Sequence, residues 1–135
     1  PFRRALELAG IVAQSGEPDV LRLSEPVRVV DGESVYVAHP ADAFELEVKI
    51  DFAHPVIGQQ EGRWRVTPES FSRELAPART FGMLSWVEEL RGKGLIRGAS
   101  SENTIVLDER AVVGTTLRWP DEFVRHKAMD VVGDL

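Results

Sequence analysis

The sequence predicts an α+β fold, a two-layer sandwich whose mainly antiparallel sheet carries helices packed on one face. Segments with strand patterns come first, between residues 20 and 66, and most of the helical patterns follow them. Residues Phe44 to Phe52 alternate apolar and charged side chains, as a half-buried antiparallel strand does. Both observations predict a sheet with one face toward helices and the other toward water.

The first forty residues are predicted to hold one helix and one β-hairpin. Residues 1–11 have apolar side chains at roughly helical spacing, and Gly10 supplies a stop. Strand patterns run from Leu21 to Val30, with a break at Pro26, and from Ser34 to Ala38. The Asp31-Gly32 pair between them is typical of a hairpin turn.

Residues 14–19 have the composition of a linker, with glycine, proline and polar residues. We therefore predict a domain boundary there. Residues 1–19 would hold the C-terminal helix of a first domain and its linker, and residues 20–135 a second α+β domain. The chain lacks an initiator methionine and its last residues read as mid-helix, so we expect an excised piece whose second domain is truncated at its C-terminal end.

The later elements follow from periodicity and from helix caps. Thr67 and Pro68 suit the start of a helix, and Asp121 stands near the cap of the last one. The predicted elements are a strand at 64–66, helices at 69–75 and 84–91, a strand at 105–107 and a helix from 121 to the terminus.

Composition bounds the function. The net charge is −6 and no basic cluster overrides it, which argues against a general nucleic-acid binder. No apolar run approaches the roughly 20 residues that span a bilayer, and the N-terminus has no signal-peptide layout. Because the chain has no cysteine, any metal must be held by nitrogen and oxygen ligands.

His126 and Asp130 are the first candidate pair for chemistry. They are four residues apart in a predicted helix, so their side chains emerge on one face, one turn apart, with Asp134 a further turn along. An imidazole and a carboxylate so placed can share one metal ion. A catalytic zinc usually takes three protein ligands, so the pair predicts part of a metal site. By spacing alone, a solvated surface pair is the more common outcome.

Other single residues have ordinary readings as well. Lys127 could be a solvated residue, Asp51 a turn former at the end of a strand, and Thr80 a loop hydroxyl. His39 and His54 each precede a proline, and we interpret both as structural.

Taken together, five blocks of sequence resemble one family. The blocks are Val27–Gly32, Ile50–Pro55, Ala78–Gly82, Ser101–Val106 and Asp121–Leu135. In this order and spacing they resemble the zinc-dependent UDP-3-O-acyl-N-acetylglucosamine deacetylases, which act early in lipid A synthesis in Gram-negative bacteria. The last block is the most specific, because few other proteins carry His-Lys-x-x-Asp in that framing. One position departs from the pattern, since the family often has a lysine where this chain has Ser34.

The resemblance implies a role for each matching residue. His126 and Asp130 would be two of three protein ligands to Zn²⁺, and Lys127 would pair with a phosphate of the UDP group. Thr80 would stabilise the oxyanion, and Asp134 would orient a catalytic histidine. The implied substrate contacts are Asp51 and Phe52 for the uridine and Phe81 against the bound substrate.

The resemblance also implies an inserted β-α-β unit from Met83 to about Val106. Five apolar residues of this unit would line a passage for the acyl chain of the substrate: Leu84, Val87, Leu90, Ile96 and Val106. The alternative is that these residues form only a small core. An apolar groove in an acidic chain is nonetheless what a lipid-handling site needs.

The implied activity is hydrolysis of the N-acetyl group with release of acetate, the committed step of lipid A biosynthesis, by a cytoplasmic monomer that acts on a nucleotide-sugar lipid precursor. The family's general base, third zinc-binding histidine and catalytic histidine are absent from these residues, so we expect the isolated chain to be inactive. Two alternatives stay open: a non-catalytic α+β binding module, and a zinc amidohydrolase with another substrate. Iron could also compete for such a site.

Overall fold

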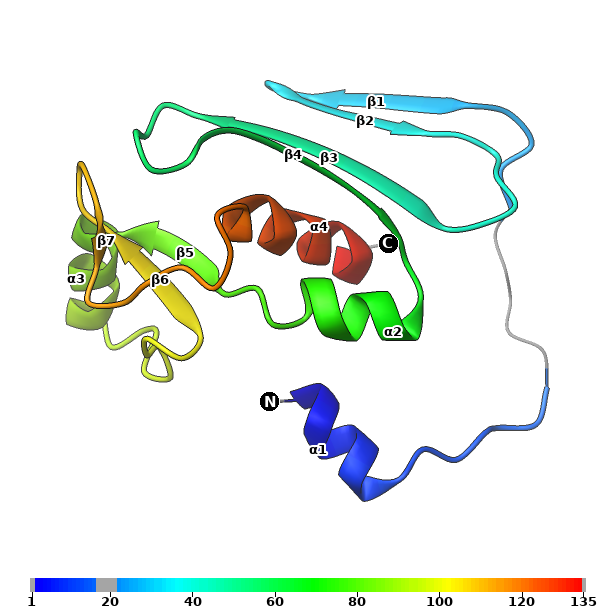
Figure 1. The fold of residues 1–135 in the computed structure, drawn as a ribbon, viewed down its shortest axis with the longest axis horizontal. Helices are drawn as coiled ribbons and strands as arrows, with labels where there is room; N and C mark the ends of the chain where they lie inside the picture. Colours follow the sequence, from blue (N-terminus) through cyan, green and yellow to red (C-terminus); the bar gives the residue numbers. More distant parts are fainter. Residues whose placement is uncertain (1, 17–21, 135) are drawn as a thin grey trace. The chain divides into compact units, whose positions relative to one another are not determined.

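The structure is a computed structural model that describes residues 2–16 and 22–134. The chain divides into two compact units, residues 1–40 and 41–135, and each is described by itself (Figure 1). The domain boundary predicted between residues 19 and 20 lies outside the described residues and stays a prediction.

The first unit holds helix α1, Phe2–Ala9, and a hairpin of β1, Val27–Asp31, and β2, Ser34–Ala38. Asp31 pairs with Ser34 across a two-residue turn, in which Gly32 has a φ of 57°. A hairpin turn of this length needs such a left-handed residue, which glycine adopts without strain. The predicted strand from Leu21 was too long, because β1 begins only after Pro26, which has no N–H for the ladder.

The second unit is built on an antiparallel pair, β3, Glu45–Phe52, and β4, Gly58–Arg65. In β3 the apolar side chains are half-buried up to residue 50 while the charged ones are exposed, which confirms the alternation read from the sequence. The strand predicted at 64–66 was too short. Residues 58–63 are mostly glycine and polar, and they form a strand because they pair with β3 rather than because of their own preference.

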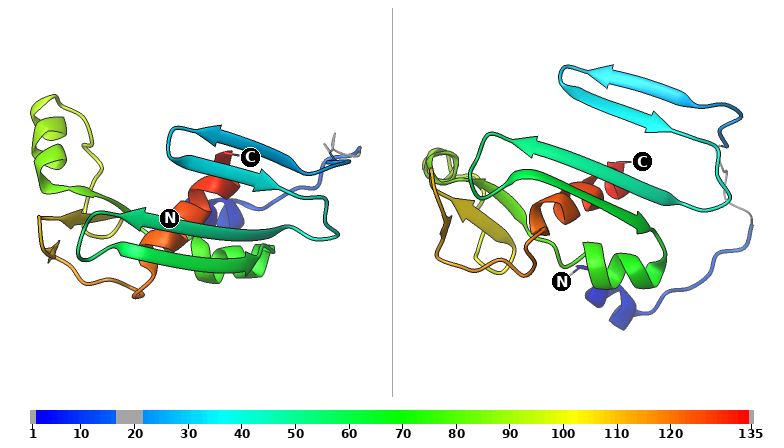
Figure 2. Two further views of the ribbon diagram at one scale, coloured as in Figure 1. Left: turned by 90° about the horizontal axis from the view of Figure 1, so that it is seen from above. Right: turned by 45° about the horizontal axis from the view of Figure 1, so that its top comes forward.

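Two helical segments cover one face of this pair. Helix α2, Pro68–Ser70, continues as a π-helical turn, η1, Phe71–Leu75. The Thr67 and Ser70 side chains each accept a hydrogen bond from the other's backbone N–H, a capping box that sets the start of α2. Helix α4, Glu122–Asp134, contacts β3, β4 and η1. Figure 2 shows α4 on one face of the β3–β4 pair, and in the left view the helix crosses the direction of the strands.

A β-α-β unit is present where the resemblance implied one, but it begins at Thr80, before the predicted start at Met83. It consists of β5, Thr80–Met83, helix α3, Leu84–Gly92, and β6, Thr104–Leu107, which pairs with β5 in parallel. A short strand that was not predicted, β7, Val112–Val113, adds to β6 in antiparallel sense. The α+β fold class is therefore confirmed, with one parallel pair inside the insert.

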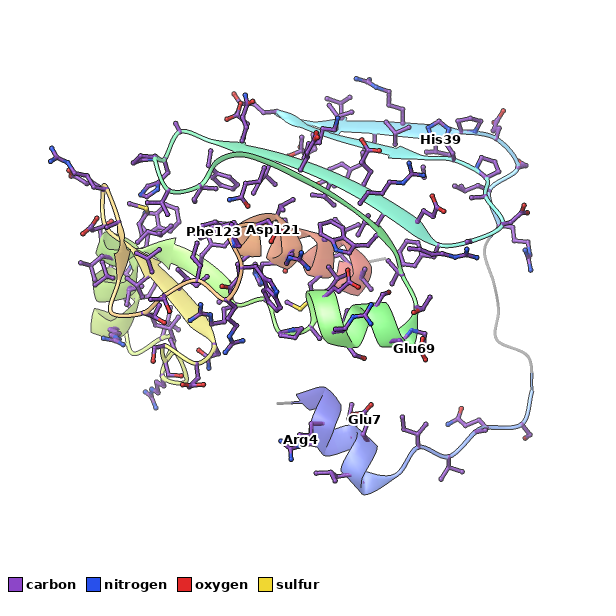
Figure 3. All side chains as sticks on the ribbon, in the orientation of Figure 1. Arg4, Glu7, His39, Glu69, Asp121 and Phe123 are labelled. Carbon is purple, nitrogen blue, oxygen red and sulfur yellow. The ribbon has the colours of Figure 1, made fainter. Side chains whose placement is uncertain are left out.

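Helix α4 joins the two halves of the core. Its Phe123 packs with Ile57 and the inward side chains of β6, Ile105 and Leu107. The next residue, Val124, belongs to the other cluster, which also contains Trp64, Leu75 and Ala128. Figure 3 labels Phe123 at the start of α4, on the side of the insert. The residues that carry the candidate site thus stand on a helix held from two sides.

The described residues contain no helix that is both long and apolar enough to cross a membrane.

Gly62 is the more crowded of the two glycines in β4. A Cβ added there would lie 2.1 Å from a ring carbon of Trp64, which is itself buried in the core. We expect Gly62→Ala to lower the free energy of unfolding by about 1–3 kcal/mol, because the indole ring has to move. Urea unfolding measures this. The matched control is Gly92→Ala, whose Cβ meets nothing within 4 Å; an equal loss in both variants would contradict the prediction.

Candidate metal and substrate site

His126 and Asp130 face each other one turn apart on α4, with 3.5 Å between His126 Nε2 and Asp130 Oδ1. Nitrogen and oxygen ligands about 2.1 Å from a tetrahedral zinc ion are about 3.4 Å apart. The separation of the two donor atoms therefore matches that of two ligands on one ion. Among the residues that the structure describes, no group of three or more His, Asp or Glu side chains could hold a metal, so the pair would supply only part of a ligand set.

The environment of His126 favours the neutral imidazole. The ring is buried, and burial is the main cause that lowers its pKa from the usual 6.5. The Asp130 carboxylate acts in the opposite direction, and the Lys127 ammonium lowers the pKa further. Neutral imidazole is the form that binds metals, so this lowered pKa suits a ligand. Nδ1 is buried and makes no hydrogen bond with the described residues. The Ala78 backbone still interacts with the ring and raises the pKa of His126.

Lys127 has two partners beside the metal pair. Its Nζ lies 3.0 Å from Asp130 Oδ2 and 5.6 Å from the centre of the Phe81 ring. Asp130 thus turns one oxygen toward the lysine and the other toward His126. The Lys127 side chain keeps 40% exposure, so an anionic ligand can reach it.

Phe81 is the centre of an aromatic cluster drawn from three elements. Its ring meets Phe52 of β3 at 5.7 Å, Phe123 at 5.0 Å and the His126 ring at 5.9 Å, each in an edge-to-face arrangement. The structure therefore brings Phe52 of β3 and Phe81 of β5 together with His126, Lys127 and Asp130 of α4, three segments that are far apart in sequence. Such a wall of rings beside a charged pair is typical of a binding site that orients a partly apolar ligand.

Three other predicted residues lie at the edges of this group. Thr80 is exposed directly before Phe81, and Asp134 is exposed one turn beyond Asp130. Asp51 is exposed, and its carboxylate accepts a hydrogen bond of 2.8 Å from Gln59. Their predicted roles stay predictions, because each depends on a ligand or on a further side chain.

A cavity of about 140 Å³ lies between α3 and β6, in the unit to which the resemblance assigned the acyl-chain passage. Val87 and Val106 line it. Leu84, Leu90 and Ile96 are half-buried but are not among its lining residues. The structure thus joins two of the five residues at one cavity. The assignment of the cavity to an acyl chain stays a prediction.

His54 has the structural role that its position before a proline suggested. Its Nδ1 accepts a hydrogen bond of 3.2 Å from the Val56 backbone N–H. Its Nε2 is therefore the nitrogen that donates to the Asp108 carbonyl at 2.7 Å. The ring ties the turn after β3 to the end of β6.

Sequence reasoning missed the buried ion pair of Arg79 and Glu122. Arg79 Nε lies 2.9 Å from Glu122 Oε1, and the two side chains are 4% and 0% exposed. Both residues stand inside the blocks 78–82 and 121–135, Arg79 directly before Thr80 and Glu122 one helical turn before His126, and this was the available signal. The pairing itself spans 43 positions and has no local pattern.

Burial is the largest single influence on the pKa of Glu122 and raises it. Hydrogen bonds from the Arg79 side chain and from the backbone N–H groups of Arg118 and Arg79 act in the opposite direction, as does the Arg79 charge. Together they bring the pKa of Glu122 below the usual 4.5. A carboxyl whose pKa is lower in the folded than in the unfolded state adds stability above its unfolded pKa. This stability is lost as the pH falls through the folded pKa.

We therefore expect the stability gap between the wild type and Glu122→Gln to be largest above pH 4.5 and to narrow below it. Urea unfolding from pH 7 to pH 3 measures the gap. A gap that is constant over this range would mean that the charge of Glu122 adds nothing.

Comparison with known proteins places the chain in one family. The family model described as LpxC, UDP-3-O-acyl N-acetylglycosamine deacetylase, matches residues 1–135. A UDP-3-O-acyl-N-acetylglucosamine deacetylase of Nitratidesulfovibrio vulgaris is 48% identical over 136 residues, which cover 99% of this chain and 44% of that protein. A protein of the same name from Myxococcus xanthus is 43% identical over 136 residues, covering 100% of this chain and 43% of that protein.

A third relative with this name, from a Nitratiruptor species, is 44% identical over 131 residues, which cover 96% of this chain and 44% of that protein. The chain thus spans less than half the length of these relatives. It belongs to the UDP-3-O-acyl N-acetylglycosamine deacetylase family.

Proposed function

We propose that the protein containing this chain is a zinc-dependent deacetylase of lipid A biosynthesis, which hydrolyses the N-acetyl group of UDP-3-O-acyl-N-acetylglucosamine. The observation that carries the proposal is the 3.5 Å separation of His126 Nε2 and Asp130 Oδ1 beside Lys127 and Phe81. Family membership supports the deacetylase activity and the substrate class. In the reaction, water adds to the amide carbon, the carbon–nitrogen bond breaks, acetate leaves and the amine takes up a proton.

The residues of this chain would divide the work. His126 and Asp130 would hold the metal, and a zinc ion bound there would polarise the amide carbonyl and lower the pKa of water. Lys127 would attract a phosphate of the nucleotide, since its ammonium is half-exposed and already beside the site. Phe81 would form an apolar wall for the sugar.

Two exposed side chains would act when substrate is bound. The Thr80 hydroxyl would donate to the oxygen that becomes negative as water adds. Asp134 would orient a histidine outside these residues, as a carboxylate does for an imidazole in many hydrolases. The Val87–Val106 cavity would receive part of the acyl chain. We propose the cytoplasm as the location, where a nucleotide-sugar precursor would be met.

The test uses the full-length protein. It is incubated with UDP-3-O-acyl-N-acetylglucosamine, and released acetate and the new primary amine are both measured. The proposal expects equal amounts of the two products, loss of turnover with a chelator, and recovery with Zn²⁺. UDP-N-acetylglucosamine without the acyl chain is the control substrate and should react far more slowly. Zinc binding without acetate release would favour another amide substrate. The absence of both would favour the non-catalytic module.

The isolated 135-residue chain is expected to release no acetate and to bind zinc much more weakly than the full-length enzyme. The described residues offer two ligands where a catalytic zinc takes three. Metal titration and an acetate assay on both proteins, purified in parallel, measure this. Turnover by the isolated chain would show that the residues needed for chemistry are all within it.

A further inference from the structure

The buried side chain of Arg79 makes more hydrogen bonds than packing in a small core requires. The guanidinium has five N–H groups, and each has an acceptor at 2.7–3.0 Å. Two bonds go to the Glu122 carboxylate, and the other three go to Ser101 O, Thr115 Oγ1 and Thr116 O. Lysine could not replace this planar fork, because its three donors leave from one nitrogen.

Glu122 ties the backbone as well as the side chain of its partner. Oε1 accepts from the Arg79 backbone N–H at 3.1 Å and from Nε at 2.9 Å. Oε2 accepts from Arg79 Nη2 at 3.0 Å and from the Arg118 backbone N–H at 2.6 Å. The first residue of α4 is thus bonded to the backbone directly before Thr80.

The two ends of this ion pair lead straight to the candidate site. Thr80 and Phe81 follow Arg79 on β5, and His126 follows Glu122 by one helical turn on α4. Phe81 and His126 then meet at 5.9 Å. Breaking a buried charge pair is costly, but replacing both members by apolar residues is often neutral for stability. What the fork adds over an apolar pair is a fixed orientation of β5 against α4.

We propose that Arg79 and Glu122 are positioning residues of the deacetylase, which set the Thr80 hydroxyl against the His126–Asp130 pair. The inference rests on the proposed function and deepens it. It predicts that the fork acts through Thr80. Loss of the fork should therefore lower turnover while the His126–Asp130 pair keeps its place on α4.

The experiment is a double-variant cycle in the full-length enzyme with Arg79→Lys, Thr80→Val and the combination. Arg79→Lys should lower kcat by about a hundredfold, as a misplacement of about 1 Å does, with KM little changed and zinc content kept. Thr80→Val should lower kcat by a similar factor. The combination should be no worse than the more damaging single variant, because the second change removes an interaction that the first has already lost.

The control for stability is Leu46→Ala, which removes core packing at the end of β3 away from Phe52. It should lower the melting temperature and leave kcat unchanged. Glu122→Gln is the second variant, which keeps the size of the side chain and removes its charge. Amide hydrogen exchange over residues 78–83 should become faster in Arg79→Lys and Glu122→Gln and stay unchanged in Leu46→Ala.

The other outcomes can be told apart from the expected one. If the effects of Arg79→Lys and Thr80→Val multiply, or if Arg79→Lys lowers only the melting temperature, the pair is structural. If Arg79→Lys does not fold, Glu122→Gln in the same cycle and the exchange measurement decide. If Thr80→Val has no effect in an active enzyme, the fork does not act through Thr80. An inactive wild type would overturn the proposed function itself.

Discussion

His126→Ala in the full-length enzyme is expected to lose bound zinc and deacetylase turnover together. The variant removes one of the two donor atoms that stand 3.5 Å apart on α4, and the described residues offer no third ligand to replace it. Loss of a group that only orients a metal ligand lowers metal affinity about 10- to 100-fold, so loss of a ligand itself should lower it by more than about a hundredfold. Zinc content after dialysis and acetate release are measured on the same preparation.

Asp130→Ala should give the same double loss, with one added consequence. Lys127 loses the carboxylate that it contacts at 3.0 Å, so its ammonium is free to move away from the Phe81 ring. His39→Ala is the matched control, since it makes the same change as His126→Ala at an exposed position outside the second unit. Stoichiometric zinc in both α4 variants would contradict the ligand assignment.

The sequence predicted those elements whose pattern is local. The alternation of β3 and the helical spacing of α4 are local patterns, and both elements lie within one residue of where they were predicted. The prediction of β4 was too short because Gly58 to Arg63 have little intrinsic preference for a strand and depend on pairing with β3. Strand β7 has two residues, too few for any period to appear.

The same division holds for the candidate site. The His126–Asp130 pair could be predicted because one helical turn separates them. The Phe52–Phe81–Phe123 cluster could not, because its members come from three elements and meet only after the insert has packed on α4. Phe52 and Phe81 lie in blocks that resemble the family, as does Phe123, but the resemblance does not say which side chains contact each other. Arg79 and Glu122 also lie in such blocks, yet their pairing was not predicted, because it spans 43 positions.

Phe123→Ala is expected to lower the free energy of unfolding by about 3–5 kcal/mol. The side chain is fully buried, packs against both Ile105 and Leu107, and supports the Phe81 ring at 5.0 Å. Natural domains have a total stability of about 5–15 kcal/mol, so the loss is a large part of it. Urea unfolding followed by tryptophan fluorescence measures the change.

Phe44→Ala is the matched control, because it makes the same substitution at a position that is 43% exposed. It removes less buried area, and we expect a loss of no more than about 1.5 kcal/mol. Phe123→Ala should also weaken zinc binding in the full-length enzyme, whereas Phe44→Ala should not. Phe123 supports Phe81, and Phe81 in turn packs on the ring of His126. If Phe123→Ala lowers stability and leaves zinc affinity unchanged, then α4 holds its metal ligands without help from the insert.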